Sequence, residues 1–81
     1  MPKQFLLEHL DRIHTTAAGE KRIRKNLELD ENDDVVQLCR RSIMKSGTMV
    51  LHSGKNYYVY LNHLSFTINE RTFTIITAHQ Q

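Results

Sequence analysis

The stretch that decides the fold is Asn56-Tyr-Tyr-Val-Tyr-Leu-Asn-His-Leu-Ser-Phe-Thr-Ile-Asn-Glu-Arg-Thr-Phe-Thr-Ile-Ile-Thr-Ala-His79. It is rich in β-branched and aromatic residues, which favour strands, and two polar pairs, Asn62-His63 and Glu70-Arg71, interrupt it at about strand length. The pattern therefore predicts an antiparallel meander with strands over residues 56–61, 64–69 and 72–78. A further strand over 48–53 precedes them and enters through Gly54-Lys55.

The register of this meander follows if both polar pairs are two-residue loops. Val59 then lies opposite Phe66, Ile68 opposite Phe73, and Phe66 opposite Ile75. One face carries the apolar residues Tyr57, Val59, Leu61, Leu64, Phe66, Ile68, Phe73 and Ile75, and we expect helices to cover it. The other face carries Tyr58, Tyr60, Ser65, Thr67 and Thr74. Thr77 and His79 are expected to continue the covered face toward the helices.

Three segments before the sheet show apolar residues at helical spacing. They predict helices over residues 2–14, 17–27 and 35–45, with Thr15 or Thr16 and then Asp33 or Asp34 as N-terminal caps. We predict an α+β fold in which three N-terminal helices (helical part, 2–46) pack on one face of a four-stranded antiparallel sheet (48–79). A chain of 81 residues corresponds to one domain, 1–81.

Composition excludes several classes of protein. No run of 18 apolar residues is present, so the sequence predicts no membrane span, and its start does not resemble a signal peptide. The single cysteine, Cys39, cannot form an internal disulfide, which fits a reducing, cytoplasmic compartment. The net charge of +2 is too small to indicate nucleic-acid binding by itself, although residues 35–81 hold five Lys and Arg against one acidic residue.

Two motifs near the ends of the chain point to a family. Residues 14–27 read HTTxxGxxRIxxNL, and residues 74–79 read TIITAH. With the Asn-Tyr-Tyr-Val-Tyr segment at 56–60, the chain resembles a family of small bacterial proteins described only as a domain of unknown function. It departs from that family at Gln80, where a basic residue is usual. The order of elements is also similar to the barnase, colicin and RelE type of small ribonucleases, an analogy of fold with no matching motif.

The ribonuclease analogy suggests a catalytic centre. Metal-independent RNA cleavage needs a base, an acid and a cation for the phosphate. His14 and His79 would form the acid–base pair, Arg22 would bind the phosphate, and Thr15 or Thr77 would donate a hydrogen bond. Asn26 shares a helical face with Arg22 and could contact substrate. The alternative interpretation is that His14, Thr15 and Asn26 cap helix ends, that Arg22 is a surface residue and that His79 belongs to a frayed terminus.

The aromatic pair Tyr58 and Tyr60, together with His52, is expected on the open sheet face and gives a second hypothesis. Such a face could stack RNA bases or form a homodimer interface, and we rank self-association first. The sequence shows no metal-ligand spacing and implies no cofactor, and Cys39 is expected to be a core residue. The leading function hypothesis is therefore a small RNase-like, possible toxin-type or RNA-processing domain that binds RNA. The alternative is a non-catalytic interaction or dimerisation module.

Overall fold

A computed structural model describes residues 2–81 of the chain. Its elements, in chain order, are α1 (Pro2–Leu7), the short 3₁₀ helix η1 (Leu10–Arg12), α2 (Ala17–Asn26), α3 (Val35–Met44), β1 (Met49–Ser53), β2 (Asn56–Leu61), β3 (Leu64–Asn69) and β4 (Ile75–Gln80). The strands form one antiparallel sheet in the order β1-β2-β3-β4. The predicted α+β architecture, with helices first and a four-stranded antiparallel sheet after them, is confirmed.

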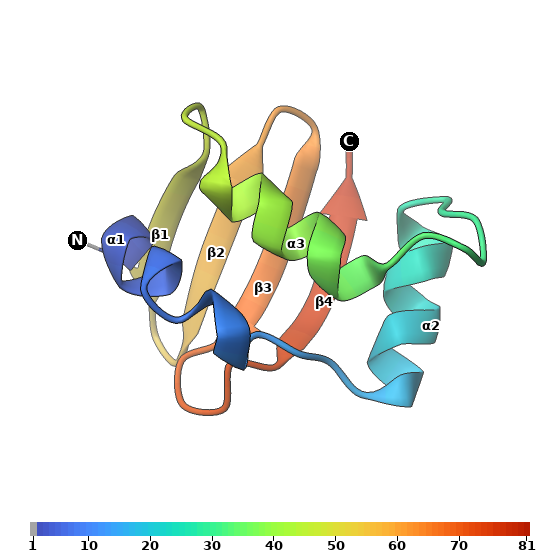
Figure 1. Cartoon of the computed structure of the whole chain (residues 1–81), viewed down its shortest axis with the longest axis horizontal. Coiled ribbons are helices and arrows are strands. Elements are labelled where there is room, and N and C mark those ends of the chain that lie inside the picture. Colours follow the sequence, from blue (N-terminus) through green and yellow to red (C-terminus); the bar gives the residue numbers. More distant parts are fainter. Residues whose placement is uncertain (1) are drawn as a thin grey trace.

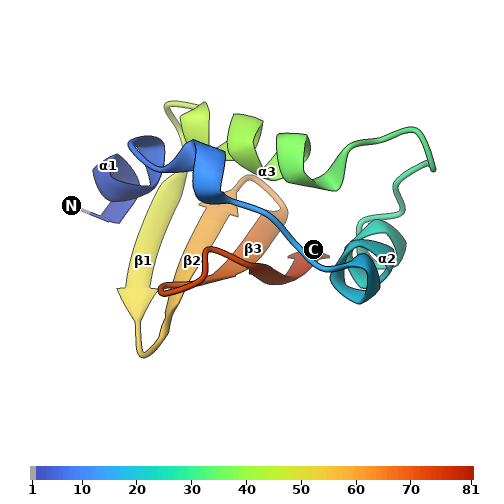
Figure 2. The ribbon, with the colours of Figure 1, turned by 60° about the horizontal axis from the view of Figure 1, so that its bottom comes forward.

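The helices occupy one side of the sheet. α1 and α3 lie across one face, and α2 lies beside the outer edge of β4 (Figures 1 and 2). The core lies between the helices and the sheet. Its fully buried side chains are those of Leu6, Ile23, Val35, Cys39 and Ile43 from the helices and of Val59, Phe66, Ile68 and Ile75 from the strands. The opposite face of the sheet is covered by none of the described elements.

The first helix is shorter than the predicted 2–14. It ends at Leu7, and η1 follows after a break at His9, whose φ of −129° is not helical. The ring nitrogen Nδ1 of His9 lies 2.8 Å from the carbonyl oxygen of Phe5, while the backbone N–H of His9 donates to Leu6 instead. In a continuous α-helix the N–H of His9 would donate to the carbonyl of Phe5. The imidazole of His9 bonds to that carbonyl instead, and the α-helix ends.

The other two helices match their predictions at both ends to within one residue. The Thr16 hydroxyl accepts from the N–H of Gly19 at the start of α2, and the Asp34 carboxylate accepts from the N–H of Gln37 at the start of α3. Gly19 is required by close packing, since a Cβ atom there would lie 2.5 Å from Oγ1 of Thr15.

The predicted register holds for the β2–β3 hairpin and fails after it. Val59 pairs with Phe66 across the two-residue loop Asn62-His63. The Glu70-Arg71 loop is longer than predicted, because the side chain of Asn69 accepts hydrogen bonds from the N–H groups of Arg71 and Thr72. β4 therefore begins at Ile75 and not at residue 72.

Phe73 lies in this longer turn with φ at +60°, a value that a bulky side chain rarely adopts. Its ring is buried, stacks against Phe5 and His9, and lies 4.4 Å from the guanidinium carbon of Arg12. These contacts compensate for the backbone strain that the side chain brings to the turn.

A bulge then reverses the faces of β4. Ile68 pairs with Ile75, but Thr67 pairs with Thr77, so one additional residue is inserted in β4 between the two pairs. The predicted pairs Ile68–Phe73 and Phe66–Ile75 are wrong, and Phe66 pairs with Ala78.

A one-residue shift sends every later side chain to the opposite face. Thr77 pairs with Thr67, and His79 pairs with Ser65, so both lie on the open face. The prediction that Thr77 and His79 face the helices is wrong for this reason.

Candidate functional site

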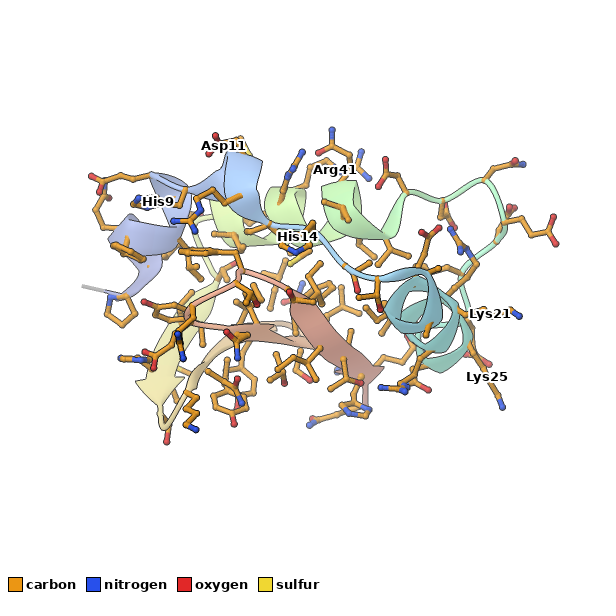
Figure 3. All side chains as sticks on the ribbon, turned by 90° about the horizontal axis from the view of Figure 1, so that it is seen from below. His9, Asp11, His14, Lys21, Lys25 and Arg41 are labelled. Carbon is orange, nitrogen blue, oxygen red and sulfur yellow. The ribbon has the colours of Figure 1, made fainter. Side chains whose placement is uncertain are left out.

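The two histidines predicted as an acid–base pair lie apart. His14, labelled in Figure 3, forms a parallel bridge with Thr74 at the outer edge of the sheet, just before β4 begins. His79 lies five positions after Thr74, about 16 Å along the strand at the usual rise per residue, and on the open face. One phosphate group cannot reach both imidazoles, and the predicted catalytic pair is not formed.

The side chain of His14 has a structural arrangement of its own. Nδ1 lies 2.8 Å from the carbonyl oxygen of Arg12, and because a carbonyl only accepts, Nδ1 carries the proton. Nε2 lies 3.2 Å from the hydroxyl of Thr74. The backbone N–H of His14 donates to Phe73, and its carbonyl accepts from Ile75. His14 thus attaches the segment before α2 to the outer edge of β4.

Two other predicted site residues close the same edge. The Thr15 hydroxyl donates to the carbonyl of Ile75 at 2.8 Å, and the Asn26 amide donates to the carbonyl of Ala78 at 3.1 Å. Both side chains satisfy backbone oxygens of an edge strand, which protects that edge from pairing with another chain. These bonds give both side chains a structural role at the edge of β4.

Arg22 completes the predicted centre, and it lies elsewhere. It is exposed on α2, the helix whose Lys21 and Lys25 point away from the domain in Figure 3. The four residues predicted as catalytic are therefore distributed over three places: His14 at the outer edge beside Thr74, Arg22 on α2, and Thr77 and His79 on the open face. They do not converge on one site.

The open face of the sheet has an unusual composition. Its side chains, read from the strand register, are those of Met49, Leu51, Ser53, Asn56, Tyr58, Tyr60, Ser65, Thr67, Asn69, Thr77 and His79. None is Asp, Glu, Lys or Arg, and the four strands contain none of these residues on either face. A solvated sheet face ordinarily carries charged side chains. Low charge with tyrosine and methionine is instead the composition of interface cores.

The apolar part of this face lies over β1 and β2. Met49 pairs with Tyr60, and Leu51 pairs with Tyr58. The exposed fractions of Met49, Leu51 and Tyr60 are 54%, 48% and 37%, and they are three of the six exposed large hydrophobic residues among residues 2–81. We call Met49, Leu51, Tyr58 and Tyr60 the sheet patch. The register places the two tyrosines on this face as expected. The prediction that His52 accompanies them is wrong, because His52 pairs with the buried Tyr57 and lies on the covered face.

The apolar pattern does not assign Met49 and Leu51 to the open face, although the turn that follows them does. The strand Met49-Val-Leu-His-Ser53 alternates only weakly, so its faces cannot be read from hydrophobicity alone. Pairing through the tight Gly54-Lys55 turn, with Gly54 at φ +60°, assigns Val50 to the core and its two neighbours to the open face.

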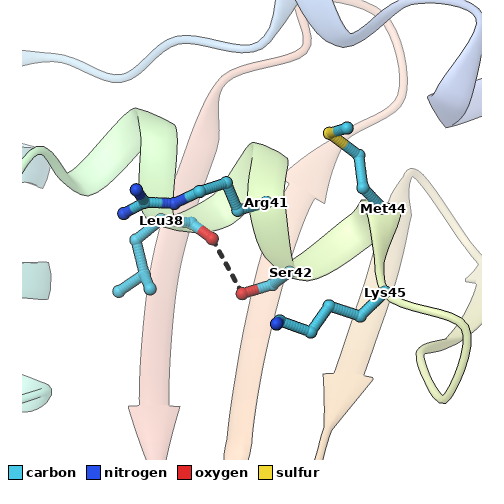
Figure 4. Close-up of a pocket in the computed structure, with 5 residues that line it drawn as sticks. All are labelled: Leu38, Arg41, Ser42, Met44 and Lys45. Atoms are coloured by element: carbon cyan, nitrogen blue, oxygen red, sulfur yellow. Dashed lines mark hydrogen bonds between the residues drawn. The ribbon is translucent and has the colours of Figure 1, made fainter.

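A hollow of about 330 Å³ lies along α3, lined by Leu38, Arg41, Ser42, Met44 and Lys45 (Figure 4). The Ser42 hydroxyl is satisfied, since it donates to the carbonyl of Leu38 at 2.7 Å. The lining comes from α3 and the Lys45 that follows it, and it contains no histidine or carboxylate. It therefore lacks the convergent acid–base groups that a catalytic pocket requires.

The described residues also offer little for nucleophilic or metal chemistry. Burial raises the pKa of the Cys39 thiol to about 12, against a smaller opposite effect of Arg40, so the thiol is protonated at neutral pH. Burial and the Glu70 carboxylate raise the pKa of Tyr57. Within residues 2–81, no group of three or more His, Cys, Asp or Glu side chains is placed to hold a metal ion.

None of the helices described is long and apolar enough to cross a membrane.

Comparison with known proteins adds one finding. A family model with the description "Protein of unknown function (DUF3781)" matches residues 7–79. Neither the curated proteins nor the solved structures contain a match to the chain.

Proposed function

Because the chain belongs to the DUF3781 family, whose description assigns no activity, we propose its function from its geometry: it is a non-catalytic interaction module that binds a protein partner through the open face of its sheet. The observation that carries the proposal is the absence of Asp, Glu, Lys and Arg from this face. Water solvates such a surface less well than a charged one, so covering it with another protein is favourable.

The distribution of charge over the rest of the molecule supports this proposal. The chain has 20 Asp, Glu, Lys and Arg residues, and all of them lie in the helices, turns and connecting segments. The sheet patch adds large side chains with few rotatable bonds, which lose little entropy when they are fixed at an interface. Ser65, Thr67 and Thr77 supply hydroxyls on the remainder of the face.

The ribonuclease hypothesis is not favoured by the geometry. It needs His14 and His79 at one phosphate, but His14 pairs with Thr74 just before β4 and His79 lies five positions after Thr74 along that strand. We expect the purified chain, His14→Ala and His79→Ala to show no difference in the cleavage of a mixed-sequence RNA. A loss of cleavage in both variants, with cleavage by the parent, would restore the catalytic hypothesis.

Site-specific photo-crosslinking in the native host tests the interaction module. Benzoylphenylalanine is placed at Tyr60 on the sheet patch or at Lys25, whose side chain points away from the domain on α2 (Figure 3). The proposal predicts a discrete protein adduct from position 60 and none from position 25. The adduct should disappear when Thr67→Lys adds a charge to the same face. No adduct at position 60, or the same adducts at both positions, contradicts the proposal.

A further inference from the structure

The backbone groups on the two outer edges of the sheet differ in whether they are hydrogen-bonded. The edge of β4 is closed by the bridge at His14, by the Thr15 hydroxyl and by the Asn26 amide. β1 is the opposite edge, and Figure 2 shows α1 above it and no element beside it in the plane of the sheet. Within residues 2–81, no backbone hydrogen bond closes the outer side of β1.

The backbone groups left open on β1 can be identified. The residues that flank a two-residue turn form a hydrogen-bonded pair, and this pair is Ser53 and Asn56. Bonded and non-bonded pairs alternate along an antiparallel ladder. Leu51 and Met49 therefore direct their backbone groups at β2, and Val50 and His52 direct theirs away from the sheet.

Natural edge strands are usually protected by lysine, proline or a bulge. β1 has none of these features, because Met49-Val-Leu-His-Ser53 contains no charged residue and no proline and its pairing with β2 is regular. An open edge without protection is a template for another strand.

We propose that this chain also associates with a second copy of itself, joined by antiparallel pairing of β1 with β1 of that copy. The proposal goes beyond the proposed function, since pairing at the edge leaves the open face free for the partner that binds there. A two-fold axis beside Leu51 places Leu51 opposite its own counterpart, Val50 opposite His52, and Met49 opposite Ser53. All five residues of β1 are then paired, and Val50 and His52 exchange their open backbone groups.

Charge and area favour this occupant. β1 itself contains no Asp, Glu, Lys or Arg, the Glu70 carboxylate at its edge lies 2.6 Å from Nε2 of His52, and a net charge of +2 causes little repulsion between two copies. The open face of one copy covers roughly 19 Å by 17 Å, or about 320 Å² in projection, at standard strand spacings. A specific interface takes about 800 Å² of accessible surface from each partner. Pairing at β1 joins two faces and their two sheet patches into one surface of eight strands.

Disulfide trapping tests the register in a Cys39→Ala chain. Leu51→Cys is expected to form a covalent dimer under mild oxidation, because residues opposite each other at the axis are within disulfide reach. Ser53→Cys is the matched control and should not do so alone, since its counterpart lies about 14 Å away. A mixture of Met49→Cys and Ser53→Cys should give the heterodimer.

Sedimentation of the purified full chain tests the association itself. The mass should rise from 9.5 kDa toward twice that value with concentration, and Leu51→Lys should weaken the dimer at least tenfold. A monomer at all concentrations, with no Leu51→Cys dimer, overturns the second-copy proposal but leaves the photo-crosslinking test of the interaction module intact. A dimer that forms equally in Leu51→Lys and gives no Leu51→Cys disulfide overturns pairing through β1.

Discussion

Because the thiol of Cys39 is buried, we expect the free energy of unfolding to fall as the solution becomes alkaline. Its side chain has no exposed surface, and its pKa is raised from 9.0 to about 12, chiefly by burial. As pH rises above 9, the unfolded chain loses the thiol proton while the folded chain keeps it. The unfolded state then binds fewer protons, so the free energy of unfolding falls by about 1.4 kcal/mol per pH unit. The stabilisation is complete below pH 9 and is lost as pH approaches 12.

The magnitude follows from these two pKa values. Between pH 7.5 and 10.5 the thiol alone should lower the free energy of unfolding by about 2 kcal/mol. Urea unfolding at both pH values measures this change for the parent and for Cys39→Ala, which lacks the titrating group. The variant loses about 1 kcal/mol at pH 7.5 from the cavity, but its further loss at pH 10.5 should be about 2 kcal/mol smaller than that of the parent.

The comparison isolates one group because Tyr57 and every lysine are present in both chains. Both chains are measured at the same concentration, since self-association makes stability depend on concentration. If parent and variant lose the same free energy between pH 7.5 and 10.5, then Cys39 is not a buried thiol of raised pKa, and the packing of α3 on the sheet is wrong.

Two further substitutions test the contacts that place α2 beside β4. In urea unfolding, Gly19→Ala should destabilise the fold by about 1–2 kcal/mol although alanine favours helices, because the new Cβ meets Oγ1 of Thr15. Gly47→Ala is the control: a Cβ there has nothing within 4 Å, so its free energy of unfolding should change by less than about 0.5 kcal/mol. Asn26→Ala should cost about 1 kcal/mol and speed amide exchange in β4, since the carbonyl of Ala78 loses its donor; unchanged exchange would show that this bond does not close the edge.

Much of the fold could be predicted because its signals are local. Caps such as Thr16 and Asp34 act within one turn of chain, and the loop Asn62-His63 fixes the register of the strands that it joins. The break at His9 was not visible in the apolar spacing, because Leu6 and Ile13 are both buried, as a continuous helix would also have them. It depends on a side chain that bonds to one carbonyl.

The candidate site was predicted less well because it depends on one inserted residue. The bulge in β4 follows from a long turn held by Asn69 and from the burial of Phe73 against the N-terminal segment. The Asn69 bonds are local, but the contact of Phe73 with Phe5 joins residues far apart in sequence, so no local pattern predicts the bulge. The shift of one residue moves His79 to the open face.

The direct test of the uncharged face is methionine oxidation footprinting inside cells of the native host, because the chain carries its own control. Met49 on the sheet patch and Met44 on α3 have exposed fractions of 54% and 61% in the isolated chain. In a dilute purified sample, where the chain is monomeric, both should oxidise at similar rates. In cells, Met49 should oxidise several-fold more slowly than Met44, because a partner covers the open face. Equal oxidation of the two methionines in cells would contradict the account.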